Sequence, residues 1–302
     1  MNTKSIFISI IGRTNAGKSS LMNLLVGEKI AIISPKPQTT RTKINGILTK
    51  GETQYVFVDT PGLHKGKTKL SEHMTKSASD SMRDVEMVLL MMDATRKISP
   101  AEYNTIETLK AANQPAMLLL NKVDLVSDKS VLLKLIEDFS KLYPFKEILP
   151  ISVVKKINTD KILPLLDKYA VESPHFFPDD QVTDQSQRAW LAEIVREKVL
   201  YNLNEEIPHG VAVEIESLDE HENRGGSKIK DIGVVIICEK DSHKGIIIGK
   251  QGATLKKIAT LAREELEDFY GEKVNLQCFV KVKEDWRNRE RLISDFGLDS
   301  KG

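Results

Sequence analysis

Short, nearly uninterrupted apolar runs alternate with helix-like segments through the first half of the chain. The runs are SIFISII (5–11), TQYVFVD (53–59), VEMVLLMMD (85–93), PAMLLLN (115–121) and EILPI (147–151). Strands of this kind are buried on both faces, and their alternation with helices favours a doubly wound sheet. KINGILTK (43–50) is separated from TQYVFVD only by a short Gly-containing turn, which predicts an antiparallel hairpin. The first half is therefore predicted to be an α/β unit with a mixed sheet.

The pattern changes in the second half. SPHFFPDDQVTD (173–184) has two prolines, clustered acids and no periodicity, which is typical of a linker. The helix predicted over 188–203 repeats apolar residues every fourth position, which indicates one buried stripe. That stripe consists of Leu191, Val195, Val199 and Leu203.

Two strands and two helices are predicted next, followed by a third strand. VAVEIESL (211–218) and IKDIGVVIICEK (229–240) are strand-like, with HENRGGSK (221–228) as their hairpin loop. A helix over 254–270 and a strand over VNLQCFVKVKEDW (274–286) complete an α+β unit. One face of that helix is expected to carry Leu255, Ile258, Ala262, Leu266 and Phe269.

Composition sets broad limits on this picture. A chain of 302 residues favours about two domains, which we assign to 1–172 and 187–302, with a linker over 173–186. Cys238 and Cys278 lie in apolar strand-like runs, and this favours buried thiols in a reducing compartment over a metal site. No apolar run approaches the roughly 18–20 residues of a membrane span, so we expect a cytoplasmic protein. Nothing resembles a heptad seam, and a monomer is the expectation.

A phosphate-binding loop follows the first strand. GRTNAGKS (12–19) fits the pattern G-x-x-x-x-G-K-[ST] and leads into an amphipathic helix. Backbone N–H groups and the helix N-terminus favour phosphate there. Lys18 is expected to reach the β- and γ-phosphates, and Ser19 to offer its hydroxyl to Mg²⁺. The expected nucleotide-binding residues of this segment are Gly12, Asn15, Ala16, Gly17, Lys18, Ser19 and Ser20.

Two further segments are expected to respond to a γ-phosphate. YVFVDTPG (55–62) ends in Asp59-Thr60-Pro61-Gly62, where Asp59 can hold Mg²⁺ and the Gly62 N–H can sense the γ-phosphate. AIISPKPQTTRTKI (31–44) reads as a loop. A threonine in it can close on Mg²⁺; we favour Thr40, although the sequence does not separate it from Thr39.

The base is expected to be guanine. LLLNKVD (118–124) is an apolar run ending in Asn121-Lys122-x-Asp124. A carboxylate at Asp124 can accept hydrogen bonds from guanine N1–H and N2–H₂, donors that adenine lacks on that edge. Asn121 would support the loop and the Lys122 stem would cover the base. In LPISVVK (149–155), Ser152 and Val153 are expected to present a backbone N–H to guanine O6.

The means of hydrolysis is less defined. Leu63 stands where Ras-like enzymes carry the glutamine that orients water, so we expect slow hydrolysis assisted by a monovalent cation, by backbone groups or by a partner. Asn15 is a candidate K⁺ ligand, with a structural role in the loop as the alternative. Arg41 is either an arginine finger in cis or a solvated switch residue.

A second glycine loop lies far from the first. Gly249-Lys250-Gln251-Gly252 joins two predicted helices, an arrangement typical of KH domains, whose GXXG loop clamps a nucleic-acid backbone. Five lysines and one acid lie between 240 and 257. The expected RNA-binding residues are Lys244, Ile248, Gly249, Lys250, Gln251, Gly252, Lys256 and Lys257. Because the last strand follows both helices, the topology is expected to be that of a type II KH domain.

Taken together, GRTNAGKS, PQTTR, DTPGLH, NKVD, FFPDDQVTDQSQR and IIIGKQG resemble the Era family of bacterial GTPases over nearly the whole chain. The resemblance implies an α/β P-loop GTPase domain followed by a C-terminal α+β type II KH domain. It also implies a Mg²⁺-dependent GTP/GDP switch that binds 16S rRNA near its 3′ end and assists assembly of the 30S subunit. Peripheral membrane association is a further property of the family. Thr14, Ala16 and Val153 depart from the family's usual wording, but none of them removes a ligand side chain.

Two other functions remain open from the residues alone. A GTP-dependent RNA-modifying enzyme would need a catalytic cluster in the second half, where His209, His221 and His243 are scattered. A signalling GTPase with a protein-binding tail would not need a lysine-rich GXXG loop.

Overall fold

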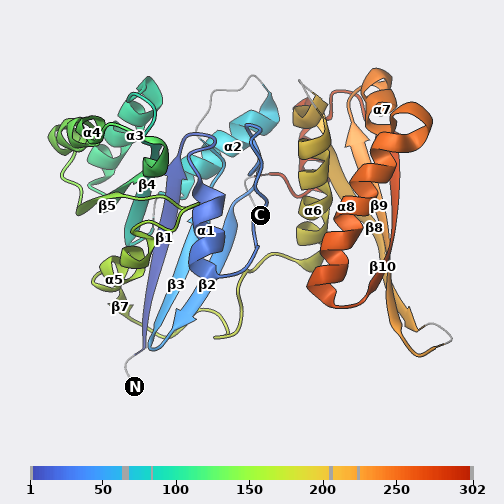
Figure 1. The fold of residues 1–302 in the computed structure, drawn as a ribbon, viewed down its shortest axis with the longest axis horizontal. Coiled ribbons are helices and arrows are strands. Elements are labelled where there is room, and N and C mark those ends of the chain that lie inside the picture. Colours follow the sequence, from blue (N-terminus) through green and yellow to red (C-terminus); the bar gives the residue numbers. More distant parts are fainter. Residues whose placement is uncertain (1–2, 63–67, 83, 204–206, 223–224, 300–302) are drawn as a thin grey trace.

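A computed structural model describes residues 3–62, 68–82, 84–203, 207–222 and 225–299, and it contains two separate sheets (Figure 1). The first sheet has the order β2-β3-β1-β4-β5-β6, with the short β7 paired to β1. Its strands are β1 (Lys4–Gly12), β2 (Ile44–Lys50), β3 (Thr53–Asp59), β4 (Met87–Asp93), β5 (Ala116–Asn121), β6 (Glu147–Pro150) and β7 (Val171–Glu172). β2 runs antiparallel to β3, and β3, β1, β4, β5 and β6 are mutually parallel, which confirms the predicted hairpin and mixed sheet.

Helices cover both faces of this sheet. Successive side chains of β4 alternate between the two cores: Leu89 and Met91 lie in one, Leu90 and Met92 in the other. Helices α1 and α5 pack on the first core, and α3 and α4 on the second. The helices and turns are α1 (Lys18–Val26), α2 (Lys69–Asp80), α3 (Pro100–Ala112), η1 (Val123–Leu125), α4 (Lys129–Leu142), η2 (Thr159–Lys161) and α5 (Ile162–Asp167).

The second sheet has the order β10-β9-β8, with β9 antiparallel to β8 and parallel to β10. The element order is α6 (Gln187–Asn202), η3 (Ile207–Gly210), β8 (Ala212–Glu222), β9 (Lys228–Cys238), α7 (Asp241–Ile248), η4 (Lys250–Gly252), α8 (Ala253–Tyr270), β10 (Lys273–Val282), η5 (Trp286–Asn288) and α9 (Glu290–Asp295). This is the predicted helix–strand–strand–helix–loop–helix–strand order. Helices α6, α7 and α8 pack on one face of the sheet.

The end of the chain departs from the prediction. β10 stops at Val282, and Trp286 turns back beneath the sheet, where it is fully buried and donates Nε1–H to the Gly210 carbonyl at 2.9 Å. Trp286 and Ile293 form a small core with Leu70 and Met74 of α2. The run 274–286 was therefore predicted too long as a strand, because its last apolar residue serves this second core.

Two other predictions about the second half were wrong in detail. The predicted 221–228 loop is shorter, since β8 extends to Glu222 and β9 begins at Lys228. Phe269 is 60% exposed and lies outside the buried face of α8, which consists of Ile258, Ala262 and Leu266. Phe269 instead packs against Trp190, with ring centroids 4.3 Å apart and ring planes tilted by 39°. Of the two cysteines, Cys238 is buried and Cys278 is half-buried.

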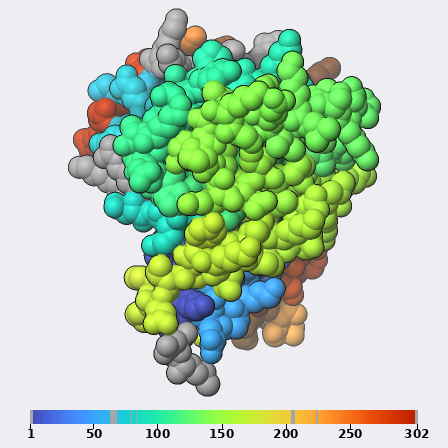
Figure 2. All heavy atoms as spheres, turned by 90° about the vertical axis from the view of Figure 1, so that its left-hand side faces the viewer, coloured from blue at the N-terminus to red at the C-terminus, as the bar shows by residue number. Residues whose placement is uncertain are grey.

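The predicted linker is held along one end of the first sheet. Gln54 Oε1 accepts from the backbone N–H groups of Phe176 and Phe177 at 2.8 and 3.0 Å, and the Phe176 ring meets Phe7 edge-on. Figure 2 shows this segment crossing below the face formed by α3, α4 and α5. The domain boundaries themselves stay a prediction. No helix in the described ranges is both long and apolar enough to cross a membrane.

Candidate functional site

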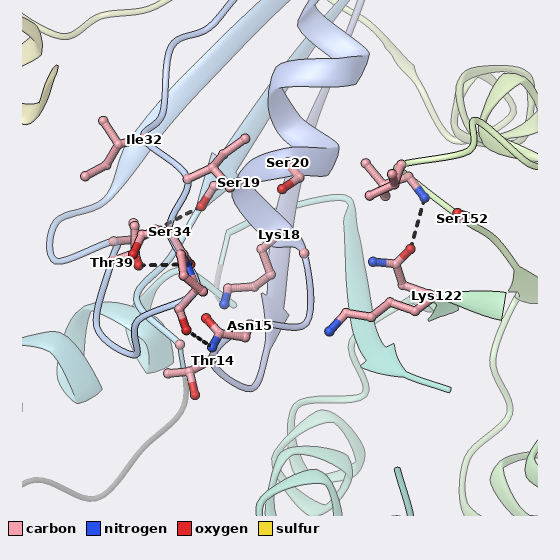
Figure 3. Close-up of a pocket in the computed structure, with 18 of the residues that line it drawn as sticks. Thr14, Asn15, Lys18, Ser19, Ser20, Ile32, Ser34, Thr39, Lys122 and Ser152 are labelled. Carbon is pink, nitrogen blue, oxygen red and sulfur yellow. Dashed lines mark hydrogen bonds between the residues drawn. The ribbon is translucent and has the colours of Figure 1, made fainter. Parts of the chain in front are cut away.

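A cavity of about 730 Å³ opens at the carboxyl ends of the parallel strands, the usual ligand position in this architecture. Figure 3 shows the loop before α1 and the segment around Ile32 on one side, and Lys122 and Ser152 on the other. Twelve of the predicted residues line it: Asn15, Gly17, Lys18, Ser19, Ser20, Thr40, Gly62, Asn121, Lys122, Asp124, Ser152 and Val153. The other five lie outside the lining: Gly12, Ala16, Asp59, Thr60 and Pro61.

The first glycine loop has a backbone that side chains would disturb. Gly17 caps α1 in a left-handed conformation with φ 103°, and no side chain caps the helix. A Cβ at Gly17 would lie 2.5 Å from Asn121 Nδ2. Lys18 is 6% exposed, and burial lowers the pKa of its ammonium group while the nearby Asp59 carboxylate opposes that shift. The loop thus combines backbone N–H groups with one buried cation, which suits phosphate.

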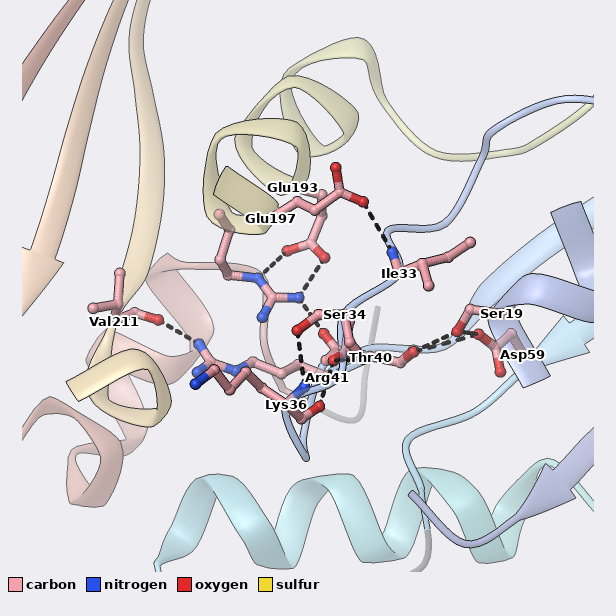
Figure 4. A network of polar contacts seen from close by, with 12 residues as sticks. Ser19, Ile33, Ser34, Lys36, Thr40, Arg41, Asp59, Glu193, Glu197 and Val211 are labelled. Carbon is pink, nitrogen blue, oxygen red and sulfur yellow. Dashed lines mark hydrogen bonds and ion pairs between the residues drawn. The ribbon is translucent and has the colours of Figure 1, made fainter. Parts of the chain in front are cut away.

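Three oxygen-bearing side chains converge behind Lys18. Ser19 Oγ donates to Asp59 Oδ2 at 2.6 Å and lies 2.9 Å from Thr40 Oγ1, which is 3.4 Å from Asp59 Oδ2 (Figure 4). Asp59 is fully buried, and its Oδ1 has no hydrogen-bond partner among the described residues. Burial raises the pKa of Asp59, against the opposing effect of Lys18. A buried carboxylate with an unused oxygen beside two hydroxyls fits a hard divalent cation such as Mg²⁺.

The two adjacent threonines point in different directions. Thr40 Oγ1 joins Ser19 and Asp59, as given above. Thr39 Oγ1 instead donates to the Lys36 carbonyl at 2.7 Å, within its own loop. The geometry therefore favours Thr40 over Thr39 as the metal-facing residue.

The predicted guanine end is built around Asn121. Its Nδ2 donates to the Ala16 carbonyl at 2.8 Å, which ties this strand end to the phosphate loop. Lys122 has φ 67° and pairs with Asp93 at 2.7 Å, while Asp124 is exposed in η1 and lines the cavity. These positions leave the Asp124 carboxylate available to a purine edge.

The backbone N–H groups predicted to reach guanine O6 are both used within the protein. Ser152 N donates to the Ile157 carbonyl at 3.1 Å, and Val153 N donates to Asn121 Oδ1 at 3.1 Å. Val154, the next residue, also lines the cavity and is 82% exposed. Ser152 and Val153 therefore shape this end of the cavity through their internal hydrogen bonds.

The end of β3 lies tightly against the phosphate loop. A Cβ at Gly62 would come within 2.6 Å of Thr14 Cγ2 and 2.8 Å of the Thr14 backbone nitrogen. Thr60 donates its hydroxyl to the Ile10 carbonyl at 3.1 Å. Leu63, which stands where Ras-like enzymes carry the glutamine that orients water, lies outside the described residues.

Asn15 and Arg41 have partners that the sequence did not indicate. Asn15 Nδ2 donates to the Pro35 carbonyl at 2.7 Å and so joins the phosphate loop to the 31–44 loop. Arg41 was expected to be an arginine finger or a solvated residue, and both interpretations are wrong. It is 3% exposed, and its guanidinium donates to the carbonyls of Val211 at 2.5 Å and His209 at 2.9 Å, in the second unit. Held by these bonds, the Arg41 side chain does not line the cavity.

Sequence reasoning also missed the contribution of α6. Its predicted stripe is buried, but Arg196 and Glu197, which lie outside that stripe, are 2% and 3% exposed. Arg196 donates to the Thr39 carbonyl, and Glu197 Oε1 accepts from Ile33 N at 3.0 Å. Tyr201, on the same helix, lines the cavity. Charged residues beside an apolar stripe are typical of a solvated helix face. Arg196 and Glu197 are buried only because the first unit packs against this side of α6.

The second glycine loop lies between α7 and α8. Gly249 has φ 73°, and a Cβ there would lie 2.2 Å from Thr254 Oγ1. Gly252 has φ 80° and begins α8 without a side-chain cap, but a Cβ there would meet nothing within 4 Å. Around the loop, Lys244 and Ile248 are half-buried, whereas Lys250, Gln251, Lys256 and Lys257 are exposed. The arrangement offers exposed cations and helix N–H groups to an anionic backbone.

Comparison with known proteins identifies the family. Residues 7–122 match a family described as "50S ribosome-binding GTPase", and residues 206–287 match "KH domain". The chain is 49% identical to GTPase Era of Clostridioides difficile over 298 residues, which cover 99% of both chains. It belongs to the Era family of GTPases. A second Era GTPase, from Clostridium perfringens, is 50% identical over 97% of this chain and 98% of its own.

Two solved Era structures share the whole fold. One is Era in complex with MgGDPNP and nucleotides 1506–1542 of 16S ribosomal RNA; it has a TM-score of 0.93, 36% identity, and coverage of 98% of this chain and 99% of its own. The other is an Aquifex aeolicus Era variant bound to GDP·AlF4⁻, with a TM-score of 0.92, 36% identity, and coverage of 98% and 100%. The chain thus combines a P-loop GTPase domain with a KH domain, and the complexes of its relatives indicate guanine nucleotide binding.

Proposed function

We propose that this GTPase is a nucleotide-controlled RNA-binding switch that binds 16S rRNA near its 3′ end and assists assembly of the 30S subunit. The observation that carries the proposal is the position of Thr40 and Arg41. The Thr40 hydroxyl lies within hydrogen-bond distance of Ser19, which is itself bonded to Asp59. Arg41, the next residue, donates hydrogen bonds to backbone carbonyls of the second unit. One short segment therefore contacts both the candidate metal site and the unit that carries the GXXG loop.

At the nucleotide, the proposed roles follow the geometry of the cavity. Lys18 binds the β- and γ-phosphates, together with the N–H groups of the loop that ends at Gly17. Gly62 presents its N–H to the γ-phosphate. Asp124 accepts two hydrogen bonds from guanine, and Asn121 holds that strand end on the phosphate loop.

Ser19, Thr40 and Asp59 are the proposed Mg²⁺ ligands, with Asp59 acting directly or through a water. The ion would neutralise developing phosphate charge when bound. Its arrival would also compensate the unpartnered Asp59 oxygen. K⁺ bound near Asn15 remains a separate proposal; equal GTPase rates in NaCl and KCl would exclude it.

At the RNA, we propose that the loop from Gly249 to Gly252 clamps the backbone while Lys250, Lys256 and Lys257 contribute charge. Lys244, Ile248 and Gln251 complete the proposed surface. We also propose a cytoplasmic location with peripheral membrane association, as the family resemblance implies.

The test is binding to a short RNA that copies the 3′ end of 16S rRNA, with GDP and with a non-hydrolysable GTP analogue. We expect tighter binding in the GTP-like state. Gly249→Asp/Gly252→Asp should abolish binding, because it places two negative charges and two strained side chains in the loop. Gly271→Asp, at another positive-φ glycine with open space for a Cβ, is the matched control.

Absence of binding in both nucleotide states would contradict the RNA role and favour a GTPase with a protein partner. Equal binding in both states would keep the RNA role and remove the coupling.

A further inference from the structure

Helix α6 lies against the 29–41 segment through contacts to its backbone. Trp190 Nε1 donates to the Lys29 carbonyl at 3.1 Å, and Glu197 accepts from Ile33 N seven residues further along. Lys29 Nζ also reaches Glu197 Oε2 at 2.7 Å. Figure 4 shows Glu197 reaching from this helix to Ile33. Glu193 instead pairs with Arg196 of the same helix. Two of these three contacts are made to backbone atoms of the 29–41 segment, so they depend on the conformation of its backbone.

Tyr201 continues the same side of the helix. Residues 193, 197 and 201 are spaced by four and therefore share one face. Tyr201 lies one turn beyond Glu197 and lines the nucleotide cavity together with Ile33 and Ser34. Every other lining residue found in the described ranges belongs to the first 154 residues. The second unit thus contributes one aromatic side chain to the cavity.

The chemistry of Tyr201 suits a nucleoside phosphate. Its side chain is 53% exposed, and an aromatic ring with that much free surface gains by packing on a ligand. The ring can cover the ribose, and the phenol can donate to a ribose or phosphate oxygen.

We propose that Tyr201 contacts the bound guanine nucleotide, so that the second unit completes the nucleotide site when α6 is docked on the 29–41 segment. This inference rests on the proposed nucleotide function. Because coupling between two binding events is reciprocal, nucleotide binding then tightens the docking of α6 by the same factor that docking tightens nucleotide binding.

The experiment measures the Kd of fluorescent GDP and of a fluorescent non-hydrolysable GTP analogue for the full chain. Tyr201→Ala should raise Kd roughly 5- to 10-fold, the size of one aromatic contact or one hydrogen bond. Tyr201→Phe separates the ring from the hydroxyl. Tyr103→Ala, at an exposed tyrosine of α3 outside the cavity, should leave Kd unchanged.

A double-mutant cycle distinguishes a docked contact from a general structural effect. Glu197→Gln removes the charge that holds Lys29 and Lys198, keeps an amide oxygen that can accept from Ile33 N, and lies at a residue that does not itself line the cavity. In that background, Tyr201→Ala should cost clearly less than in the wild type, and melting curves should show that all variants are folded. An equal cost in both backgrounds would overturn the dependence on docking.

The outcomes separate this inference from the function it rests on. If the wild type binds guanine nucleotide and Tyr201→Ala binds within about twofold of it, the contact is wrong and the nucleotide function stands. If the wild type binds neither nucleotide, both are wrong.

Discussion

Asp59 shows how a single residue can prepare a site for a charged ligand. A fully buried carboxylate with one unpartnered oxygen is costly unless a cation or hydrogen bonds compensate it. Here, two hydroxyls and the Lys18 ammonium group compensate only in part, because burial still raises the pKa of Asp59. The energetic cost is therefore borne in the protein before a ligand arrives, and binding of a cation would relieve it.

Asp124 allows a test of base recognition. Asp124→Asn replaces an acceptor-only carboxylate with an amide that presents a donor to the guanine N2–H₂. We expect GTP affinity to fall by at least about 100-fold, since two hydrogen bonds to a charged group are lost. Affinity for xanthosine triphosphate should rise, because xanthine carries an oxygen where guanine carries that amino group.

Competition between the two nucleotides for the variant measures this exchange. Asp160→Asn, at an exposed aspartate of η2 outside the cavity, serves as the control. Unchanged preference for GTP in Asp124→Asn would show that another group reads the base.

At the scale of elements, the sequence predicted those parts that local pattern determines. Buried parallel strands are apolar throughout, and the glycine loops carry their residue spacing in the chain, so β1, β5 and both loops were predictable. Helix α6 and its apolar stripe were predicted as well, but its second buried side, made of Arg196 and Glu197, was not, because charged residues beside an apolar stripe are typical of a solvated face. Arg41 was misread for the same reason. Such residues are buried by an interface between distant segments, and periodicity within one element carries no record of it.

The linker provides a prediction that depends on pH. Nδ1 of His175 lies 2.6 Å from Asp179 Oδ1, and Nε2 lies 3.1 Å from the Glu52 carbonyl. Both ring nitrogens can donate only when the imidazole is protonated. The hydrogen bond to Asp179, and then that to Glu52, raise the pKa of His175 above its usual 6.5.

The sign of the effect follows from that shift. A raised pKa contributes stability that is fully present below the unfolded value of about 6.5 and is lost as pH rises through the folded value. His175→Gln should therefore lower Tm most at about pH 6, and the difference from the wild type should shrink by about pH 9. Asp179→Asn should flatten the pH dependence of the wild type in the same melting experiment. A constant difference across this range would show that His175 acts only by packing.

Across the whole molecule, the 29–41 segment is one of the contacts between the two units, beside the small core that α2 forms with Trp286. Near its end, Thr40 lies beside Ser19 in the candidate metal site. Lys29, Ile33 and Thr39 contact α6. Arg41 donates to the Val211 carbonyl, just before β8. Burial, and then the neighbouring Arg196, lowers the pKa of Arg41 to about 9, so the guanidinium remains charged at neutral pH. A buried charge held by backbone carbonyls fixes the relative position of the two segments that it joins.

Arg41→Met tests whether this joint carries the nucleotide signal. The substitution keeps the apolar length of the side chain but leaves the carbonyls of His209 and Val211 without their charged donor, at a cost of about 1–3 kcal/mol each. Arg41 does not line the cavity, so the affinity for nucleotide should change by less than about threefold. The ratio of RNA affinities in the GTP-like and GDP states should fall toward one, because Thr40 can then respond to the nucleotide without moving the second unit. Lys43→Met, at an exposed residue two positions away, controls for loss of charge. A ratio that survives Arg41→Met in a folded protein would place the coupling in another contact between the units, either that of α6 with Ile33 and Thr39 or the core of α2 with Trp286.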